Sequence, residues 1–175
     1  ERRIKQLPGA CHGRVAGEMM VKLGQMSNAI ARFTQELEAN PNSQFAERMR
    51  LLIGNAHFAL EELDEARTAY QALIAAYPQG DFVEDASYRS AVALLYKNDA
   101  SNGLVELEAF RTRFPSSPLL DDASYRIGEI KYQSADYQGA LTDVDGFAEK
   151  YPDTKVANEA LMLAAQTHIR DVLSP

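Results

Sequence analysis

Apolar residues along the chain recur at the spacing of about 3.6 residues that is typical of helices, and they never alternate for long as in a half-buried strand. Short polar segments interrupt this pattern at residues 23–25, 61–64, 98–101 and 135–137. Side chains that could cap a following helix lie at or near these segments: Ser27, Asp64, Ser101 and Asp136. The pattern predicts an all-α protein of helix–turn–helix units.

Prolines divide the chain at a fixed period, because Pro41, Pro78, Pro115 and Pro152 are each 37 residues apart. Proline lacks an amide donor and disfavours a helical residue before it. Each of these prolines is therefore expected to end the second helix of a unit and to open the link to the next unit.

Three further columns of residues repeat with the same period. Small residues fill two of them: Gly17, Gly54, Ala91, Gly128 and Ala165, and then Ala29, Ala66, Gly103 and Ala140. Bulky residues fill the third: Phe33, Tyr70, Leu107 and Val144. Small side chains are needed where two helices approach closely, so we expect the two helices of each unit to meet along these columns.

Four units in register predict an α-solenoid, in which each helix pair buries its apolar face on its neighbours. The expected organisation is a basic N-terminal arm over residues 1–9 and a single superhelical repeat domain over residues 10–175. The repeats are expected at about 10–46, 47–83, 84–120 and 121–157, followed by a capping helix to about residue 172. On that helix, one set of residues is expected to cover the last hairpin: Leu161, Leu163, Ala165 and Ile169.

The columns resemble those of tetratricopeptide repeats, in which a small residue is followed by alanine twelve residues later, by a bulky residue four further on, and then by proline. The second unit fits with Gly54, Ala66, Tyr70 and Pro78. The period of 37 is longer than the usual value of about 34. In addition, the bulky residue expected four places before the first small one is replaced by Arg50, Ser87 or Ser124.

The longer period, together with Asp-Ala-Ser-Tyr-Arg at residues 85–89 and 122–126, is similar to the repeats of bacterial cell-envelope proteins. These include the periplasmic protein associated with the Tol–Pal system and the outer-membrane β-barrel assembly lipoprotein. The resemblance implies a noncatalytic scaffold for protein–protein interaction, and it favours a periplasmic or envelope-associated location over the cytoplasm.

The resemblance also implies that the first helices line a concave groove that binds a protein or an extended peptide. It selects these positions: Asn55, Tyr88, Arg89, Val92, Tyr125, Arg126, Glu129 and Tyr132. A tyrosine offers a rigid ring with a polar tip, and an arginine offers planar donors for a carboxylate or a carbonyl. The alternative is repeat packing, with the tyrosines stacked between first helices and the arginines neutralising Asp85, Asp122 and Glu129.

A second alternative is a self-assembling structural module, a homo-oligomer in which the first unit of one chain stacks on the capping helix of the next. Met19, Met20, Val21 and the basic arm are the expected contact residues of the first unit. A mass that depends on concentration would favour this alternative, whereas a monomer would favour the groove.

The charge distribution argues against one class of partner, the nucleic acids. The chain has 175 residues and a net charge of −7, of which residues 1–22 contribute five basic against two acidic residues and the remainder 13 against 23. An acidic surface opposes the phosphate backbone, so no nucleic-acid partner is expected. No apolar run reaches the roughly 18 residues of a membrane helix, and a chain that begins at Glu1 suggests a mature form or an excised domain.

No residue pattern indicates catalysis, a metal or a cofactor, and the chain is predicted not to be an enzyme. His57 and His168 share one repeat column with unlike residues, which favours partly exposed packing over metal binding. Cys11 and His12 are neighbours on a predicted helix and do not face one another. The acidic run at residues 61–65 lacks the spacing of a calcium loop and is expected to be solvated.

Overall fold

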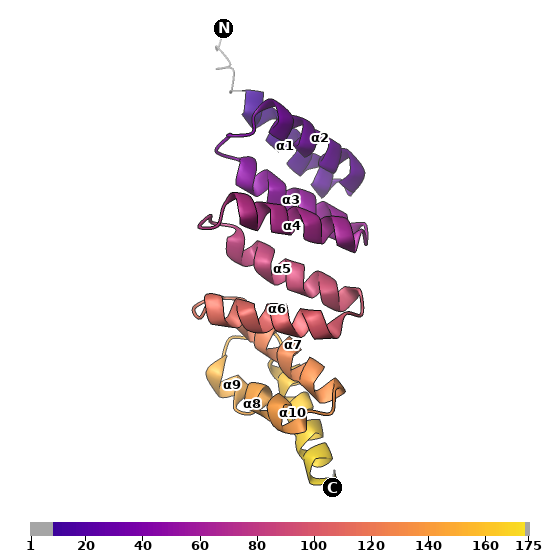
Figure 1. The fold of residues 1–175 in the computed structure, drawn as a ribbon, viewed down its shortest axis with the longest axis vertical. Helices are drawn as coiled ribbons and strands as arrows, with labels where there is room; N and C mark the ends of the chain where they lie inside the picture. Colours follow the sequence, from indigo (N-terminus) through magenta and orange to yellow (C-terminus); the bar gives the residue numbers. More distant parts are fainter. Residues whose placement is uncertain (1–8, 174–175) are drawn as a thin grey trace. The chain divides into compact units, whose positions relative to one another are not determined.

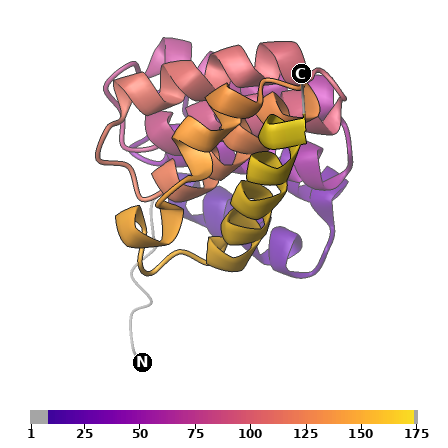
Figure 2. The same cartoon turned by 90° about the horizontal axis from the view of Figure 1, so that it is seen from below.

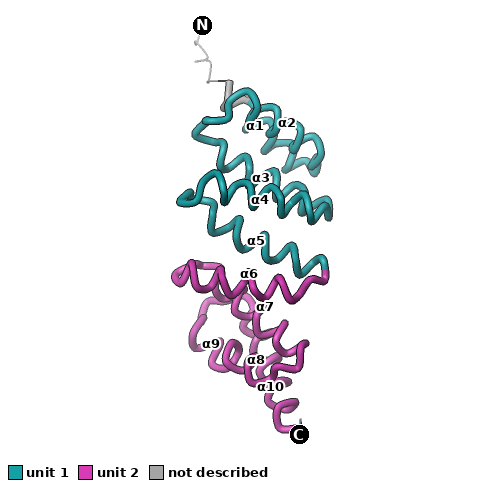
Figure 3. The backbone as a smooth tube through the Cα atoms, in the orientation of Figure 1, with its two compact units in different colours: residues 1–97 teal, residues 98–175 magenta. Residues whose placement is uncertain are grey.

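The computed structural model describes residues 9–173, with side chains from residue 13 onward (Figure 1). Every element in that range is an α-helix, and the fold is an all-α solenoid of repeated helix pairs. Residues 1–8 of the predicted arm, and the side chains of Cys11 and His12, lie outside the described part. The backbone forms two compact units, residues 1–97 and 98–175 (Figure 3). The predicted extent of the domain, residues 10–175, stays a prediction.

The first unit contains α1 to α5. The bounds are α1 Gly9–Lys22, α2 Met26–Ala39, α3 Ala46–Ala59, α4 Leu63–Ala76 and α5 Val83–Tyr96. Neighbouring helices in sequence pack on each other, so α1 and α2 form one hairpin and α3 and α4 the next, against which α5 lies. One core cluster joins the first hairpin to α3: Ala29, Phe33, Leu37, Ala46 and Met49.

The second unit contains α6 to α10. The bounds are α6 Ala100–Arg113, α7 Leu120–Gln133, α8 Tyr137–Val144, α9 Phe147–Lys150 and α10 Ala157–Leu173. The α7–α8 hairpin lies between α6, which packs on α7, and α10, which packs mainly on α8. Figure 2 shows α10 in yellow lying over this hairpin.

The predicted turns and helix ends are confirmed. Each hairpin turn contains one left-handed residue, and these lie 37 residues apart: Gly24 at φ 73°, Glu61 at 61°, Asn98 at 59° and Ala135 at 62°. The second helices end at Ala39, Ala76, Arg113 and Lys150, each two residues before a repeat proline. The backbone conformation therefore repeats with the same 37-residue period as the sequence.

Three of the four predicted caps are wrong. The N-cap positions are Gln25, Glu62, Asp99 and Asp136, so Ser27, Asp64 and Ser101 lie two residues inside their helices. Only Asp99 and Asp136 accept a bond from a backbone amide of the first turn, that of Asn102 and that of Gly139. In these three units the helix begins two residues after the left-handed residue, which is earlier than the side-chain pattern suggests.

The second helix of the fourth unit is broken, although the repeat pattern predicts one continuous helix. The α8 helix ends at Val144, and Gly146 then adopts a left-handed conformation with φ 64° before α9 begins. Glycine takes this conformation without steric cost, whereas a residue with a Cβ resists it. The break therefore depends on the glycine at this point of the repeat.

The close approach predicted at the small residues is confirmed for the glycine column, which faces the bulky column. A Cβ atom built on Gly54 would lie 2.4 Å from Cε1 of Tyr70, and one on Gly17 would lie 2.3 Å from Cε1 of Phe33. The corresponding distance from Gly128 to Cγ1 of Val144 is 2.5 Å. Each of these hairpins therefore closes on a contact that only glycine allows.

The buried face predicted for the capping helix is wrong except at Leu163. The residues of α10 that are buried are Ala160, Leu163, Ala164 and Thr167. Leu161 and Ile169 are 53% and 61% exposed, and Ala165 is exposed as well. The helix does cover the last hairpin, mainly through α8, but Leu161, Ala165 and Ile169 lie on the side of α10 opposite to the buried residues.

Replacing Gly54 with Val tests the hairpin contact. Because the added atoms overlap the ring of the fully buried Tyr70, we expect the free energy of unfolding to fall by about 1–3 kcal/mol. Urea denaturation measures this change. The control is Ala31→Val on the exposed side of α2, for which we expect only a few tenths of a kcal/mol. Equal losses in the two variants would contradict the contact.

Candidate functional site

The clearest candidate site is a hollow of about 270 Å³ between α7 and α10 in the second unit. The spacing of its residues places one face of each helix toward the other, since Tyr125, Glu129 and Tyr132 lie within two turns of α7. The full lining is Tyr125, Glu129, Tyr132, Gln133, Glu159, Met162, Leu163 and Gln166. The structure therefore brings together three of the groove residues that the sequence selected.

The two tyrosines are half-buried and form the apolar wall of this hollow. They pack against the core cluster of Val144, Leu163 and Ala164. Burial raises the pKa of Tyr125, and the charges of Glu129 and Glu159 raise it further, so its hydroxyl keeps its proton. The tyrosines therefore pack against the core, as the packing alternative predicts, and also border the open hollow.

The rim of the hollow is rich in hydrogen-bond acceptors. Within residues 13–173, neither Glu129 nor Glu159 has an ion-pair partner, and Gln133 and Gln166 add amide groups. Two uncompensated carboxylates beside aromatic rings attract a cation, both by charge and by contact with the ring faces. The hollow is therefore suited to a lysine or arginine side chain.

The two predicted groove arginines are engaged on their own helices. Arg89 Nε lies 2.7 Å from Asp85 Oδ1, and Arg126 Nε lies 2.8 Å from Asp122 Oδ2. These are the ion pairs of the packing alternative. Arg126 does not line the α7–α10 hollow, although it lies on the same helix as Tyr125.

The predicted groove residues of the first unit have different surroundings. Asn55 accepts a hydrogen bond of 2.8 Å from the hydroxyl of the buried Tyr70, and Val92 is itself buried. Tyr88 is half-buried on α5. Phe58 meets Tyr96 edge to face, with ring centroids 5.2 Å apart, and this pair links α3 to α5.

Sequence reasoning missed a second hollow, of about 330 Å³, in the first unit. It is lined by residues of α2, α3 and α4: Thr34, Leu37, Glu38, Arg50, Ile53, Ala69 and Ala72. The Nε atom of Arg50 is buried and makes no hydrogen bond within the described part of the chain. The available signal was the arginine itself, which replaces the bulky residue of the repeat pattern.

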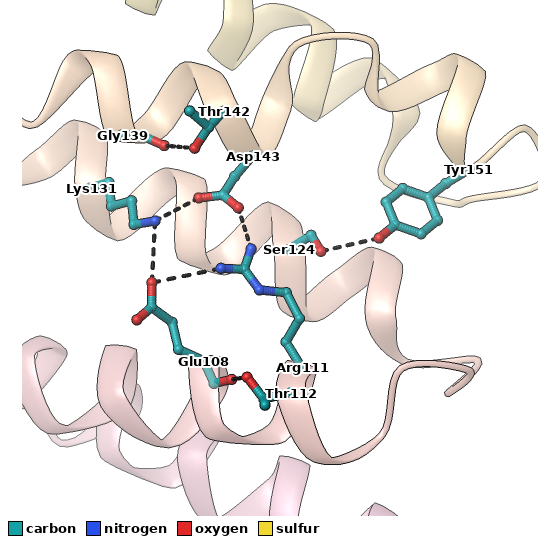
Figure 4. A network of polar contacts seen from close by, with 9 residues as sticks. All are labelled: Glu108, Arg111, Thr112, Ser124, Lys131, Gly139, Thr142, Asp143 and Tyr151. Carbon is teal, nitrogen blue, oxygen red and sulfur yellow. Dashed lines mark hydrogen bonds and ion pairs between the residues drawn. The ribbon is translucent and has the colours of Figure 1, made fainter.

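An ion-pair network connects α7 to α6 and α8 (Figure 4). The carboxylate of Asp143 on α8 is 5% exposed, contacts Arg111 of α6, and lies 2.8 Å from Nζ of Lys131 on α7. Glu108 of α6 lies 3.2 Å from the same Nζ atom. Burial lowers the pKa of Lys131, but the hydrogen bonds and charges of Asp143 and Glu108 outweigh it, so the pKa lies above its usual value.

The other candidates between residues 13 and 173 form no reactive cluster. His57 Nδ1 lies 2.7 Å from Glu62 Oε2, and His168 Nε2 lies 2.9 Å from Asp145 Oδ1. From residue 13 to residue 173, no group of three histidine, cysteine or acidic residues could hold a metal ion. The helices described in the structure include none that is long and apolar enough to cross a membrane.

The exposed surface predicted for the first unit is partly wrong. Met19 is 53% exposed, but Met20 and Val21 are partly buried and pack against the core cluster of Phe33 and its neighbours. The helical period turns these two residues inward. From residue 13 onward, the large apolar residues that α1 exposes are therefore Val15 and Met19, and Leu23 is exposed in the turn that follows.

Two family models match the chain. A tetratricopeptide-repeat model matches residues 21–81, and the model of the YfiO outer membrane lipoproteins matches residues 81–174, which is more than half of the chain. The chain belongs to the YfiO family of outer membrane lipoproteins. The hollow between α7 and α10 lies wholly within the part that the YfiO model matches.

Solved structures show the same fold for this YfiO-family chain. A tetratricopeptide repeat protein from Parabacteroides merdae has a TM-score of 0.76 at 14% identity over 91% of the chain, which spans 60% of that structure. MamA from Desulfovibrio magneticus has a TM-score of 0.69 at 17% sequence identity, and the match covers 94% of this chain and 93% of MamA. YrrB, described as a tetratricopeptide repeat protein with an unusual peptide-binding site, has a TM-score of 0.69 at 16% sequence identity. The match covers 91% of this chain and 76% of YrrB. No curated protein matches the chain.

Replacing Asp143 with Asn tests the network of Figure 4. The change leaves Arg111 and Lys131 to share the single carboxylate of Glu108, so we expect the free energy of unfolding to fall by about 1.5–3 kcal/mol at neutral pH. Thermal and urea unfolding measure it. Asp153→Asn, at an exposed position, is the matched control and should change stability little. A stable Asp143 variant would contradict the network.

The raised pKa of Lys131 predicts a loss of stability at high pH. A lysine whose pKa is raised by folding stabilises the protein fully below its unfolded value of about 10.4, and this contribution is lost as pH rises through the folded value. We expect the difference in free energy of unfolding between wild type and Lys131→Met to be constant near neutral pH and to shrink above that value. A difference independent of pH would show that the ammonium charge is not involved.

Proposed function

We propose that this chain is a noncatalytic scaffold that binds a protein segment in the hollow between α7 and α10, within a protein assembly at the bacterial outer membrane. The observation that carries the proposal is the convergence of Tyr125, Glu129, Tyr132 and Glu159 on one concave surface. Tetratricopeptide repeats are helical scaffolds, and preordered side chains lose less freedom on binding than those of a flexible loop.

The chemistry of the hollow favours an extended segment with a lysine or arginine between apolar residues. Its cation would lie between Glu129 and Glu159, and the rings of Tyr125 and Tyr132 would contact the aliphatic stem. The sequence prediction gave the gripping role to Arg126, but this role passes to the glutamates because Arg126 is paired with Asp122.

In the first unit, where Asn55, Tyr88, Arg89 and Val92 were predicted, the proposal keeps Arg89 as a separate contact residue. Arg89 is the most exposed of these four, and it could exchange Asp85 for a carboxylate of the partner.

The envelope setting of the proposal comes from membership of the YfiO outer membrane lipoprotein family. Within that setting we infer a role of the kind served by β-barrel assembly or Tol–Pal-associated repeat proteins, on the periplasmic side of the outer membrane. The described peptide-binding site of YrrB supports the choice of a peptide ligand.

Selection from a random peptide display library tests this function directly. Wild type should enrich segments that contain Lys or Arg, and the Glu129→Gln, Glu159→Gln double variant should bind the selected peptides about tenfold more weakly, because it removes both charges but keeps the shape. Glu149→Gln, at an exposed position on α9, is the control and should bind them like wild type. Enrichment without basic residues, or equal binding by the double variant, would refute the proposal.

A further inference from the structure

The hollow of about 330 Å³ in the first unit lies among helices that already have their repeat neighbours. It is lined by α2, α3 and α4, which pack on one another in sequence order, while α1 packs on α2 and α5 packs on α4. Its volume is at the lower end of the range of roughly 300–1,000 Å³ that is usual for small-molecule sites. The hollow is therefore large enough to hold a small ligand.

Most of the residues around this hollow are apolar. Leu37 of α2 is buried, and Ile53 of α3 is partly buried against the same core cluster. Ala69 and Ala72 of α4 lie three residues apart, on one face of their helix. Because their side chains are short, they leave open the space that longer side chains would fill. The hollow thus suits an apolar group about the size of a branched side chain.

Arg50 places one cation in this apolar lining. Its Nε atom is buried and makes no hydrogen bond within the described part of the chain, and its guanidinium forms no ion pair within residues 13–173. A buried donor without an acceptor is unfavourable, so an acceptor from outside the chain is expected at this atom. Repeat packing does not require an arginine here, because the same column holds Gly13, Ser87 and Ser124 in the other units.

The charges around the hollow favour a monoanion. A carboxylate can accept from Nε and from a terminal nitrogen of a guanidinium together, and it also neutralises the positive charge. Glu38 of α2 borders the hollow as well, is exposed, and forms no ion pair with Arg50. It would repel a second negative charge, which disfavours a phosphate monoester with its charge of about −1.5 to −2 at neutral pH.

We propose that the hollow between α2, α3 and α4 binds a small carboxylic acid with a branched apolar body. The carboxylate accepts hydrogen bonds from Arg50, and the apolar body lies against Leu37, Ile53 and the two alanines of α4. This site has the opposite preference to the α7–α10 hollow, which is suited to a basic side chain. Binding here requires nothing of that second hollow.

Titration of the whole chain with 4-methylpentanoate, followed by the amide signals in heteronuclear NMR spectra, tests the proposal. We expect saturable shifts confined to residues of α2, α3 and α4 around the hollow, with a Kd of about 1 mM or tighter. The amide of the same acid, 4-methylpentanamide, has the same shape but no charge, and it should bind about tenfold more weakly or worse.

Replacing Arg50 with Met tests the role of the guanidinium. This variant keeps an apolar stem and should bind the acid about tenfold more weakly, with unchanged helical circular dichroism. Arg48→Met is the matched control, because it removes the same charge from α3 at a residue that pairs with Glu18 and does not line the hollow. It should bind the acid like wild type.

Replacing Ala72 with Leu tests the shape of the site. Ala72 is exposed on the wall of the hollow, so the longer side chain should block the acid without disturbing the fold. Ala75→Leu, at an exposed position of α4 that does not line the hollow, should bind normally. No saturable shift with wild type, shifts outside α2, α3 and α4, equal binding of the amide, or undiminished binding by Arg50→Met or Ala72→Leu would each overturn the proposal.

Discussion

The structure depends on one close contact, in which a glycine on the first helix of a hairpin accepts the bulky side chain of the second. At Gly54 and Tyr70 the ring occupies the space that a Cβ atom would need. This contact sets the distance between the two helices. It also lets the hydroxyl of Tyr70 donate a hydrogen bond to Asn55, the residue after Gly54. Burial raises the pKa of Tyr70, so the hydroxyl stays neutral and continues to donate this bond.

The candidate site is a consequence of this packing. The α7 helix is fixed on one side by the contact between Gly128 and Val144, and its position is further held by Lys131, which connects it to both neighbouring helices. Tyr125, Glu129 and Tyr132 are thereby left on the side toward α10. The hollow needs no loop and no cofactor, because its walls are two helices whose separation the core determines.

The sequence predicts the features that the local residues determine, and it misses those that depend on which helices pack alongside. Repeated prolines and glycines located the hairpins correctly, because helix ends and close contacts follow from the residues themselves. The cap after Glu61 was missed because this residue adopts a left-handed conformation that its side chain does not favour. The exposed face of α10 and the hollow beside Arg50 were missed because exposure depends on which helices lie alongside.

The most direct test of the proposed groove is site-specific photo-crosslinking in the native host, with a benzophenone amino acid in place of Tyr132 in the hollow and, separately, in place of Tyr96, which is 62% exposed on α5. The account predicts one discrete crosslinked protein of the cell envelope from position 132, and its loss when Glu129 and Glu159 are changed to Gln. No crosslink at position 132, or one that the glutamate changes leave untouched, would contradict the claim that this hollow binds a partner.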